Sequence, residues 1–156
     1  MMKWRVLLAA AVFLGFLGIA RSADDRTKVP DARQTTEKFL AAALAGKTKE
    51  AAALGEPGKS YNREEKIKEF EGLNVFGKKL ALTRVLADDQ AALAITEKVV
   101  ETKRGQEGPL SIRLVKKDNR WLIRDVDFGE KSAAKNMQRF QREHPKAKPV
   151  DPKKDK

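Results

Sequence analysis

The spacing of hydrophobic residues changes once along this chain, from a helical period to the period of a strand. Between residues 30 and 73 apolar side chains recur every three or four positions, as with Phe39, Leu40 and Ala43. Between Leu80 and Phe128 they alternate with other residues. A period of about 3.6 indicates an amphipathic helix, and a period of two indicates a half-buried strand. The pattern therefore predicts helices followed by antiparallel strands, the α+β class.

Three helices are predicted in the first part of the chain. Asp31 is expected to be the N-cap of the first, because Gln34 completes a capping box, and Gly46 is expected to end it. A short second helix is predicted over Thr48–Leu54. A third is predicted to begin with Asn62 as its cap.

The second part of the chain predicts four strands in two hairpins, a meander. Asp88-Asp89 supplies the turn of the first hairpin and Asp118-Asn119 that of the second, and Lys103–Pro109 is a longer connection. Residues 130–144 are predicted to form a C-terminal helix. Residues 145–156, rich in Lys, Pro and Asp, are predicted to be a disordered basic tail.

The N-terminus has the pattern of a secretory signal peptide, residues 1–22. Lys3 and Arg5 precede an uncharged run, Val6–Ala20, and cleavage is expected after Ala20 or Ser22. The run is shorter than the roughly 20 apolar residues of a membrane anchor, which is the alternative interpretation. We therefore expect an exported protein, periplasmic or secreted, with a polar lead at residues 23–29 and one folded domain at residues 30–129.

Charge and composition limit the classes of partner and cofactor that we expect for this protein. The formal net charge is +11, but the basic excess is concentrated in residues 131–156, while residues 23–130 are nearly balanced. Such a distribution argues against nucleic acid as a partner. The tail is expected either to contact an anionic envelope surface weakly or only to aid solubility. The sequence contains no Cys and a single His, His144, so no metal site and no cofactor are predicted.

Two segments carry a family resemblance: Phe39–Lys47, FLAAALAGK, and Leu114–Ile123, LVKKDNRWLI. Together with the short Ala-rich second helix they resemble the nuclear transport factor 2-like superfamily, or cystatin-like α+β cones, in particular its exported bacterial members of unknown function. The resemblance covers about residues 30–128. It implies a curved sheet around the helices, enclosing a cone that can hold a ligand. Some members are isomerases, dehydratases or cyclases, many are accessory binding domains, and their sheets often pair into homodimers.

The strand alternation suggests candidate site residues. If Asp118-Asn119 forms a two- or four-residue loop, Lys116 lies opposite Trp121 and Ile112 opposite Asp125. Asp125 and Asp127 then share the face of Trp121 and Ile123, and in the first hairpin Arg84 and Glu97 likewise share the apolar face. On the concave side these residues would line a pocket, with Asp125 or Asp127 as general base and Tyr61 or Trp121 positioning a ligand. Alternatively, the strand ends emerge into solvent and the charges lie at the rim.

The opposite face of the second hairpin offers a second candidate site. The same register places Arg113 across from Arg124, and like charges in that position repel. A bound anion or a carboxylate from a helix would relieve the repulsion. A three-residue loop would instead pair Arg113 with Asp125 in an ordinary ion pair.

Three functions are consistent with these patterns. The sequence favours a non-catalytic exported module that binds a small molecule or a protein. The alternatives are a small-molecule lyase or isomerase that uses a carboxylate in the cone, and adhesion to envelope polyanions through the tail. A deep apolar pocket enclosing Asp125 or Asp127 with Tyr61 would favour the enzyme. A cone filled by Phe39, Leu44, Phe70 and Trp121 would exclude it.

Overall fold

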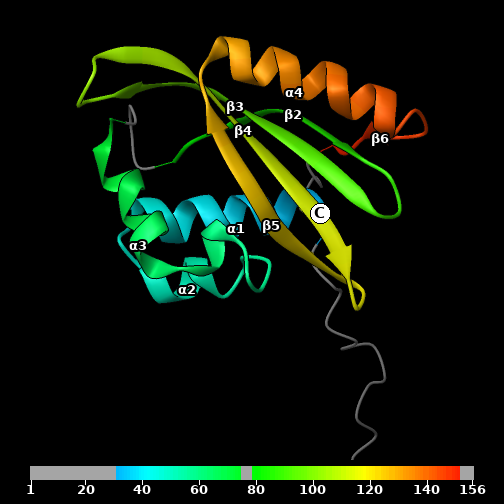
Figure 1. Cartoon of the computed structure of the whole chain (residues 1–156), viewed down its shortest axis with the longest axis horizontal. Helices are drawn as coiled ribbons and strands as arrows, with labels where there is room; N and C mark the ends of the chain where they lie inside the picture. The colour runs from blue at the N-terminus through cyan, green and yellow to red at the C-terminus, as the bar shows by residue number, and fades with distance from the viewer. Residues whose placement is uncertain (1–30, 75–78, 152–156) are drawn as a thin grey trace, which may run out of the picture.

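The computed structural model describes residues 31–74 and 79–151, which form an open antiparallel sheet of six strands with four α-helices (Figure 1). The predicted α+β class is confirmed at this level. The predicted signal peptide at residues 1–22 and polar lead at residues 23–29 lie outside the described residues. In the part of the chain that the structure describes, no helix is long and apolar enough to cross a membrane.

Helix α1 (Ala32–Leu44) begins with the predicted capping box. The Gln34 main-chain N–H donates to Asp31 Oδ1 at 2.9 Å, and the Asp31 N–H donates to Gln34 Oε1 at 3.3 Å. Gly46 follows the helix with φ +70°, a conformation that glycine adopts without strain. This local chemistry fixes where the central helix of the domain starts and ends.

The region after α1 is more broken than predicted. It contains α2 (Thr48–Ala52), the 3₁₀ turn η1 (Ser60–Asn62), α3 (Glu64–Ile67) and the 3₁₀ turn η2 (Lys68–Gly72). The prediction that Asn62 caps the third helix is wrong. Its side-chain amide donates instead to the carbonyl oxygens of Ala52 and Gly55, at 3.0 and 3.4 Å. Asn62 therefore ties η1 back to the end of α2.

Five strands of the sheet follow the order β5-β4-β3-β2-β6. The sixth, β1, pairs with β3. The strands are β1 (Leu73–Asn74), β2 (Leu82–Ala87), β3 (Ala91–Glu101), β4 (Gln106–Lys117), β5 (Arg120–Phe128) and β6 (Lys148–Pro149). Four of these correspond to the predicted strands. The two-residue strands β1 and β6 were not predicted, because two residues are too few to show an alternation.

The two faces of the sheet carry different elements. Helices α1, α2 and α3 lie below the sheet in Figure 1, and α4 (Glu130–Glu143) lies across its other face. On the α1 side Phe39, Ile112 and Ile123 are completely buried in one core cluster. On the α4 side Phe140 and Leu93 are buried outside that cluster. The sheet is therefore covered on both faces.

The C-terminal segment is ordered further than predicted. Disorder was expected from residue 145, but β6 pairs with β2, and the Val150 N–H donates to the Val85 carbonyl at 2.9 Å. Arg33 Nε donates to the Val150 carbonyl, also at 2.9 Å. A sheet edge offers unpaired main-chain groups, and β2 uses them to hold this segment. Residues 152–156 of the predicted tail lie outside the described residues.

His144 is anchored as well, although no role was predicted for it. Its Nδ1 lies 2.7 Å from Asp88 Oδ2, and its ring stacks on Phe140 with centroids 4.7 Å apart. Burial alone would raise the pKa of Asp88, but hydrogen bonds from the Gln90 and Ala91 N–H groups and from His144 lower it below its usual value. The end of α4 is thereby fixed to the β2–β3 turn.

Candidate functional site

A β-bulge in β5 decides where the predicted site residues lie. Asp118 and Asn119 have φ of 48° and 58°, the conformation of a two-residue hairpin turn. The predicted register holds from Lys117 opposite Arg120 to Leu114 opposite Ile123. It then shifts by one residue, so that Arg113 lies opposite Asp125 and Arg124 has no direct partner. From Asp125 onward, each β5 side chain therefore lies on the opposite face of the sheet from the one predicted.

Asp125 and Asp127 therefore lie on the α4 side, and the prediction that they share the face of Trp121 and Ile123 is wrong. Asp125 forms an ion pair with Arg113, and its Oδ1 accepts a hydrogen bond from the Val126 N–H at 3.0 Å. Asp127 Oδ2 accepts from the Asn136 side chain in α4 at 2.7 Å. Both carboxylates are thus used in holding β5 and α4 in place.

The predicted Arg113–Arg124 opposition is also absent. Arg124, the bulged residue, turns to Glu56, with Nε to Oε2 at 2.7 Å and Nη2 to Oε1 at 3.1 Å. Lys117 Nζ lies 2.7 Å from Glu56 Oε1. Hydrogen bonding by Arg124, opposed by burial and assisted by Lys117, lowers the pKa of Glu56 to about 2. Of the two partners expected, a bound anion or a carboxylate from a helix, Arg124 has a carboxylate, but it comes from Glu56 in the loop after α2.

Arg84 and Glu97 do not enter a pocket. Register shifts in β2 and β3 place Arg84 opposite Ile95, and both Arg84 and Glu97 are exposed. Glu97 Oε1 accepts a hydrogen bond from the Ala81 N–H at 3.0 Å. The prediction that these two residues contribute to a site on the apolar face is therefore wrong.

Tyr61 and Trp121 are components of the core. Tyr61 is 5% exposed, and its ring makes edge contacts with Phe39 and Phe70 at centroid distances of 6.2 and 6.3 Å. Its hydroxyl donates to the Val126 carbonyl at 3.0 Å. Burial, followed by the nearby carboxylates, raises the pKa of the Tyr61 hydroxyl above its usual range. Trp121 is buried with Lys116 Nζ 5.7 Å from its ring centroid, so aromatic side chains fill much of the space between α1 and the sheet.

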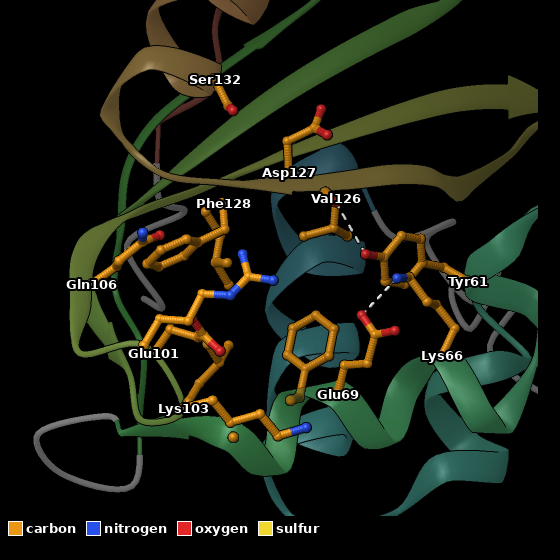
Figure 2. Close-up of a pocket in the computed structure, with 15 residues that line it drawn as sticks. Tyr61, Lys66, Glu69, Glu101, Lys103, Gln106, Val126, Asp127, Phe128 and Ser132 are labelled. Atoms are coloured by element: carbon orange, nitrogen blue, oxygen red, sulfur yellow. Dashed lines mark hydrogen bonds and ion pairs between the residues drawn. The ribbon is translucent and has the colours of Figure 1, made fainter.

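An open pocket of about 540 Å³ lies at the edge of this aromatic core (Figure 2). One wall comes from η1, α3 and η2, the opposite wall from the ends of β4 and β5, and the rim from the turn between β3 and β4. Ser132 in the first turn of α4 also lines it. The apolar lining residues are Phe70, Leu73, Leu110, Val126 and Phe128. The pocket therefore has an apolar floor.

Charged side chains surround that floor. Lys66 and Glu69 on the helical wall form an ion pair at 2.6 Å, drawn as a dashed line in Figure 2. Glu101 at the end of β3 and Lys103 and Arg104 in the β3–β4 turn also line the pocket. Asp127 lines it too, but Figure 2 places it on the other side of the β5 ribbon from Tyr61.

Sequence reasoning missed most of these residues. Of the eight candidates, only Tyr61 and Asp127 line the pocket. Lys103 and Arg104 belong to a segment that was predicted only as a connection. Two adjacent cations in a turn between long strands are the signal that was present in the sequence.

No metal site is visible in residues 31–74 and 79–151. Within them, no group of three or more His, Asp or Glu side chains is arranged to hold a metal ion. His144 contacts Asp88 alone among the acidic side chains described.

The chain was compared with known protein families, curated proteins and solved structures. No protein-family model, curated protein or solved structure matches the chain. The function must therefore be argued from the site itself.

Proposed function

We propose that this protein is an exported, non-catalytic binding module and that the pocket between η2 and the end of β5 is its ligand site. The observation that carries the proposal is the pocket of about 540 Å³ with an apolar floor and a charged rim. Small-molecule sites combine apolar walls with a few polar groups in clefts of about 300–1,000 Å³. Export is supported by residues 1–22. N-terminal sequencing of the released protein should begin at Arg21 or Ala23.

We further propose that the domain is a nuclear transport factor 2-like cone with additions. Support comes from β2, β3, β4 and β5, which are neighbours in sequence order and carry α1 on one face. The additions are α4 and β6. Because α4 lies on the opposite face, that face is not free for the sheet pairing expected from the resemblance. A small molecule in the pocket is therefore a better partner than a second copy.

Binding is better supported than the lyase or isomerase alternative. Tyr61 and Asp127 line the same pocket, as the enzyme would require. Yet the Asp127 carboxylate accepts from Asn136, and the Tyr61 hydroxyl donates to the Val126 carbonyl. A general base must reach the substrate proton that it removes, and a general acid must reach the substrate atom that it protonates. Asp125→Asn and Asp127→Asn should leave any biological activity essentially intact, and a loss of several orders of magnitude would overturn the non-catalytic assignment.

The ligand site can be tested with 1-octanol, a neutral amphiphile. Its addition should shift the amide resonances of residues around Gly72, Leu110 and Phe128. Gly72→Leu should weaken binding at least about tenfold, because leucine occupies space at the pocket. An added Cβ at Gly72 meets only Thr102 Oγ1, at 3.9 Å, so the backbone accommodates it. Ala41→Leu, on an exposed part of α1, is the control and should bind like the parent protein. Shifts scattered away from the pocket would contradict the proposal.

The basic tail is a separate candidate for adhesion to anionic surfaces. Residues 145–151 contribute to the fold, so deleting the tail would also remove β6. Replacing Lys153, Lys154 and Lys156 by Gln avoids that problem. If the tail binds, retention on anionic vesicles should fall in this variant and in salt. Unchanged retention on the vesicles would contradict the proposal that the tail binds anionic surfaces.

A further inference from the structure

The floor of the pocket is a fixed apolar surface. Phe70 is 4% exposed and makes an edge contact with Phe39 at a centroid distance of 5.6 Å. Leu110 is buried, and Val126 and Phe128 pack against the same core. Side chains fixed in this way can contact an apolar ligand without losing further rotamer freedom. The floor suits the hydrocarbon part of a ligand.

Two of the three acidic side chains that line the pocket have partners within the protein. Glu69 is paired with Lys66, whose ammonium also lies 5.9 Å from the Tyr61 ring centroid. Asp127 accepts a hydrogen bond from Asn136. The charge of Glu69 is balanced by Lys66. Asp127 keeps its negative charge, because Asn136 is a neutral donor, but Figure 2 places its side chain on the other side of the β5 ribbon from Tyr61.

The β3–β4 turn supplies the remaining charges. Within the described residues, the side chains of Lys103 and Arg104 make no ion pair or hydrogen bond, and neither does that of Glu101. Two cations thus stand against one carboxylate, an excess of one positive charge at this part of the rim. A ligand with a negative head group would meet a favourable potential here.

The turn is held in position against the helical wall. Thr102 donates to the Gly72 carbonyl through both its N–H and its hydroxyl, at 2.9 and 2.8 Å. The Gly105 N–H donates to the Glu101 carbonyl at 2.8 Å. Gly105 has φ +62°, which permits this tight turn. The two cations are therefore carried by a backbone that is anchored beside the apolar floor.

We propose that the pocket selects small amphipathic anions, with the acidic head group at Lys103 and Arg104 and the apolar part against Phe70, Leu110 and Phe128. This inference rests on the proposed binding function and adds the chemical class of the ligand. An arginine and a lysine together supply both a forked donor and a point charge for a carboxylate.

Three probes with the same chain length separate the charge from the apolar part: octanoate, 1-octanol and octyltrimethylammonium. Calorimetric titration of the purified protein should give octanoate the highest affinity, by about tenfold over either other probe. Lys103→Gln combined with Arg104→Gln should remove this preference, so that octanoate binds to the variant no more tightly than 1-octanol does. Lys38→Gln combined with Lys49→Gln removes the same charge from exposed sites outside the pocket and should change nothing.

Glu101→Gln provides a test in the opposite direction. It removes the carboxylate that opposes the two cations, so octanoate should bind several-fold more tightly and octyltrimethylammonium more weakly. Equal affinity for all three probes, each weakened by Gly72→Leu, would overturn the anion preference while leaving the binding function intact. Failure of all three probes to bind at the pocket would overturn both.

Discussion

The two faces of the sheet are held by different kinds of interaction. On the α1 side the rings of Phe39, Tyr61 and Phe70 contact one another edge to face in a core of apolar side chains. On the α4 side Asn136 donates to Ser111 Oγ and to Asp127 Oδ2, and Arg113 pairs with Asp125. The first face is stabilised mainly by burial of apolar area, the second in part by polar contacts between named partners.

In β5 the bulge decides which residues lie on which face of the sheet. Before Arg124, Trp121 and Ile123 are in the core; after it, Val126 and Phe128 pack against the core and the aspartates turn to the other side. The comparison teaches that acids which follow an apolar alternation need not enter the apolar site.

Phe39→Ala should lower the free energy of unfolding by about 3–5 kcal/mol, because it leaves a cavity among packed rings. Urea unfolding followed by circular dichroism measures the loss. Lys38→Ala, at the neighbouring exposed position of α1, is the control and should change stability by less than about 0.5 kcal/mol. A loss below about 1 kcal/mol for Phe39→Ala would show that the α1 face is loosely packed.

Glu56→Gln should cost about 2 kcal/mol, because a buried carboxylate loses its charge-assisted hydrogen bonds while its partners Arg124 and Lys117 are about half exposed. The pKa of Glu56 lies at about 2, below its ordinary value of 4.5. Its contribution is therefore complete above pH 4.5 and is lost as the pH falls toward 2. Unfolding measured across this range should show the loss in the parent protein and much less of it in the variant.

The matched control for that experiment is Glu50→Gln, which removes an exposed carboxylate paired with Lys47. It should leave both the stability and the acid dependence nearly unchanged. If the free energy of unfolding depended on pH in the same way in the parent protein and in Glu56→Gln, the Glu56 contacts would not be what holds the bulge.

Asn136→Ala should cost about 1–2 kcal/mol, because Ser111 and Asp127 each lose a hydrogen bond in a largely buried place. Hydrogen exchange should show faster opening of α4 than of α1. Lys135→Ala, on the exposed side of the same helix, should have no such effect. Equal protection of both helices in Asn136→Ala would mean that apolar packing alone holds α4.

Asp125→Asn is expected to have the smallest effect, below about 1 kcal/mol, because both partners of its ion pair are partly exposed. Thermal unfolding at low and high salt is the measurement, and any difference from the parent protein should shrink in salt. A loss as large as that of Phe39→Ala would show that this pair fixes the bulge.

Parts of this fold were predictable residue by residue. The Asp31–Gln34 capping box and the positive φ of Gly46 depend on a few adjacent residues, and both are present. The two-residue turn at Asp118-Asn119 is similarly local. The site was less predictable, because its walls come from η2, the β3–β4 turn and the end of β5, which are distant in the sequence. One clue was available: the repulsion expected between Arg113 and Arg124 in an unshifted register pointed to a change of register.

The α+β class, the ends of α1 and the positions of the hairpin turns follow from local periodicity and capping, and these can be read from short stretches of the chain. Tertiary structure decided the face of Asp125 and Asp127, the partner of Arg124 and the attachment of residues 148–150 to β2. The physical reason is that an alternating pattern does not reveal where an extra residue enters a strand. Here that position is associated with the contacts from Glu56 to Arg124 and from Tyr61 to Val126, which span more than sixty residues.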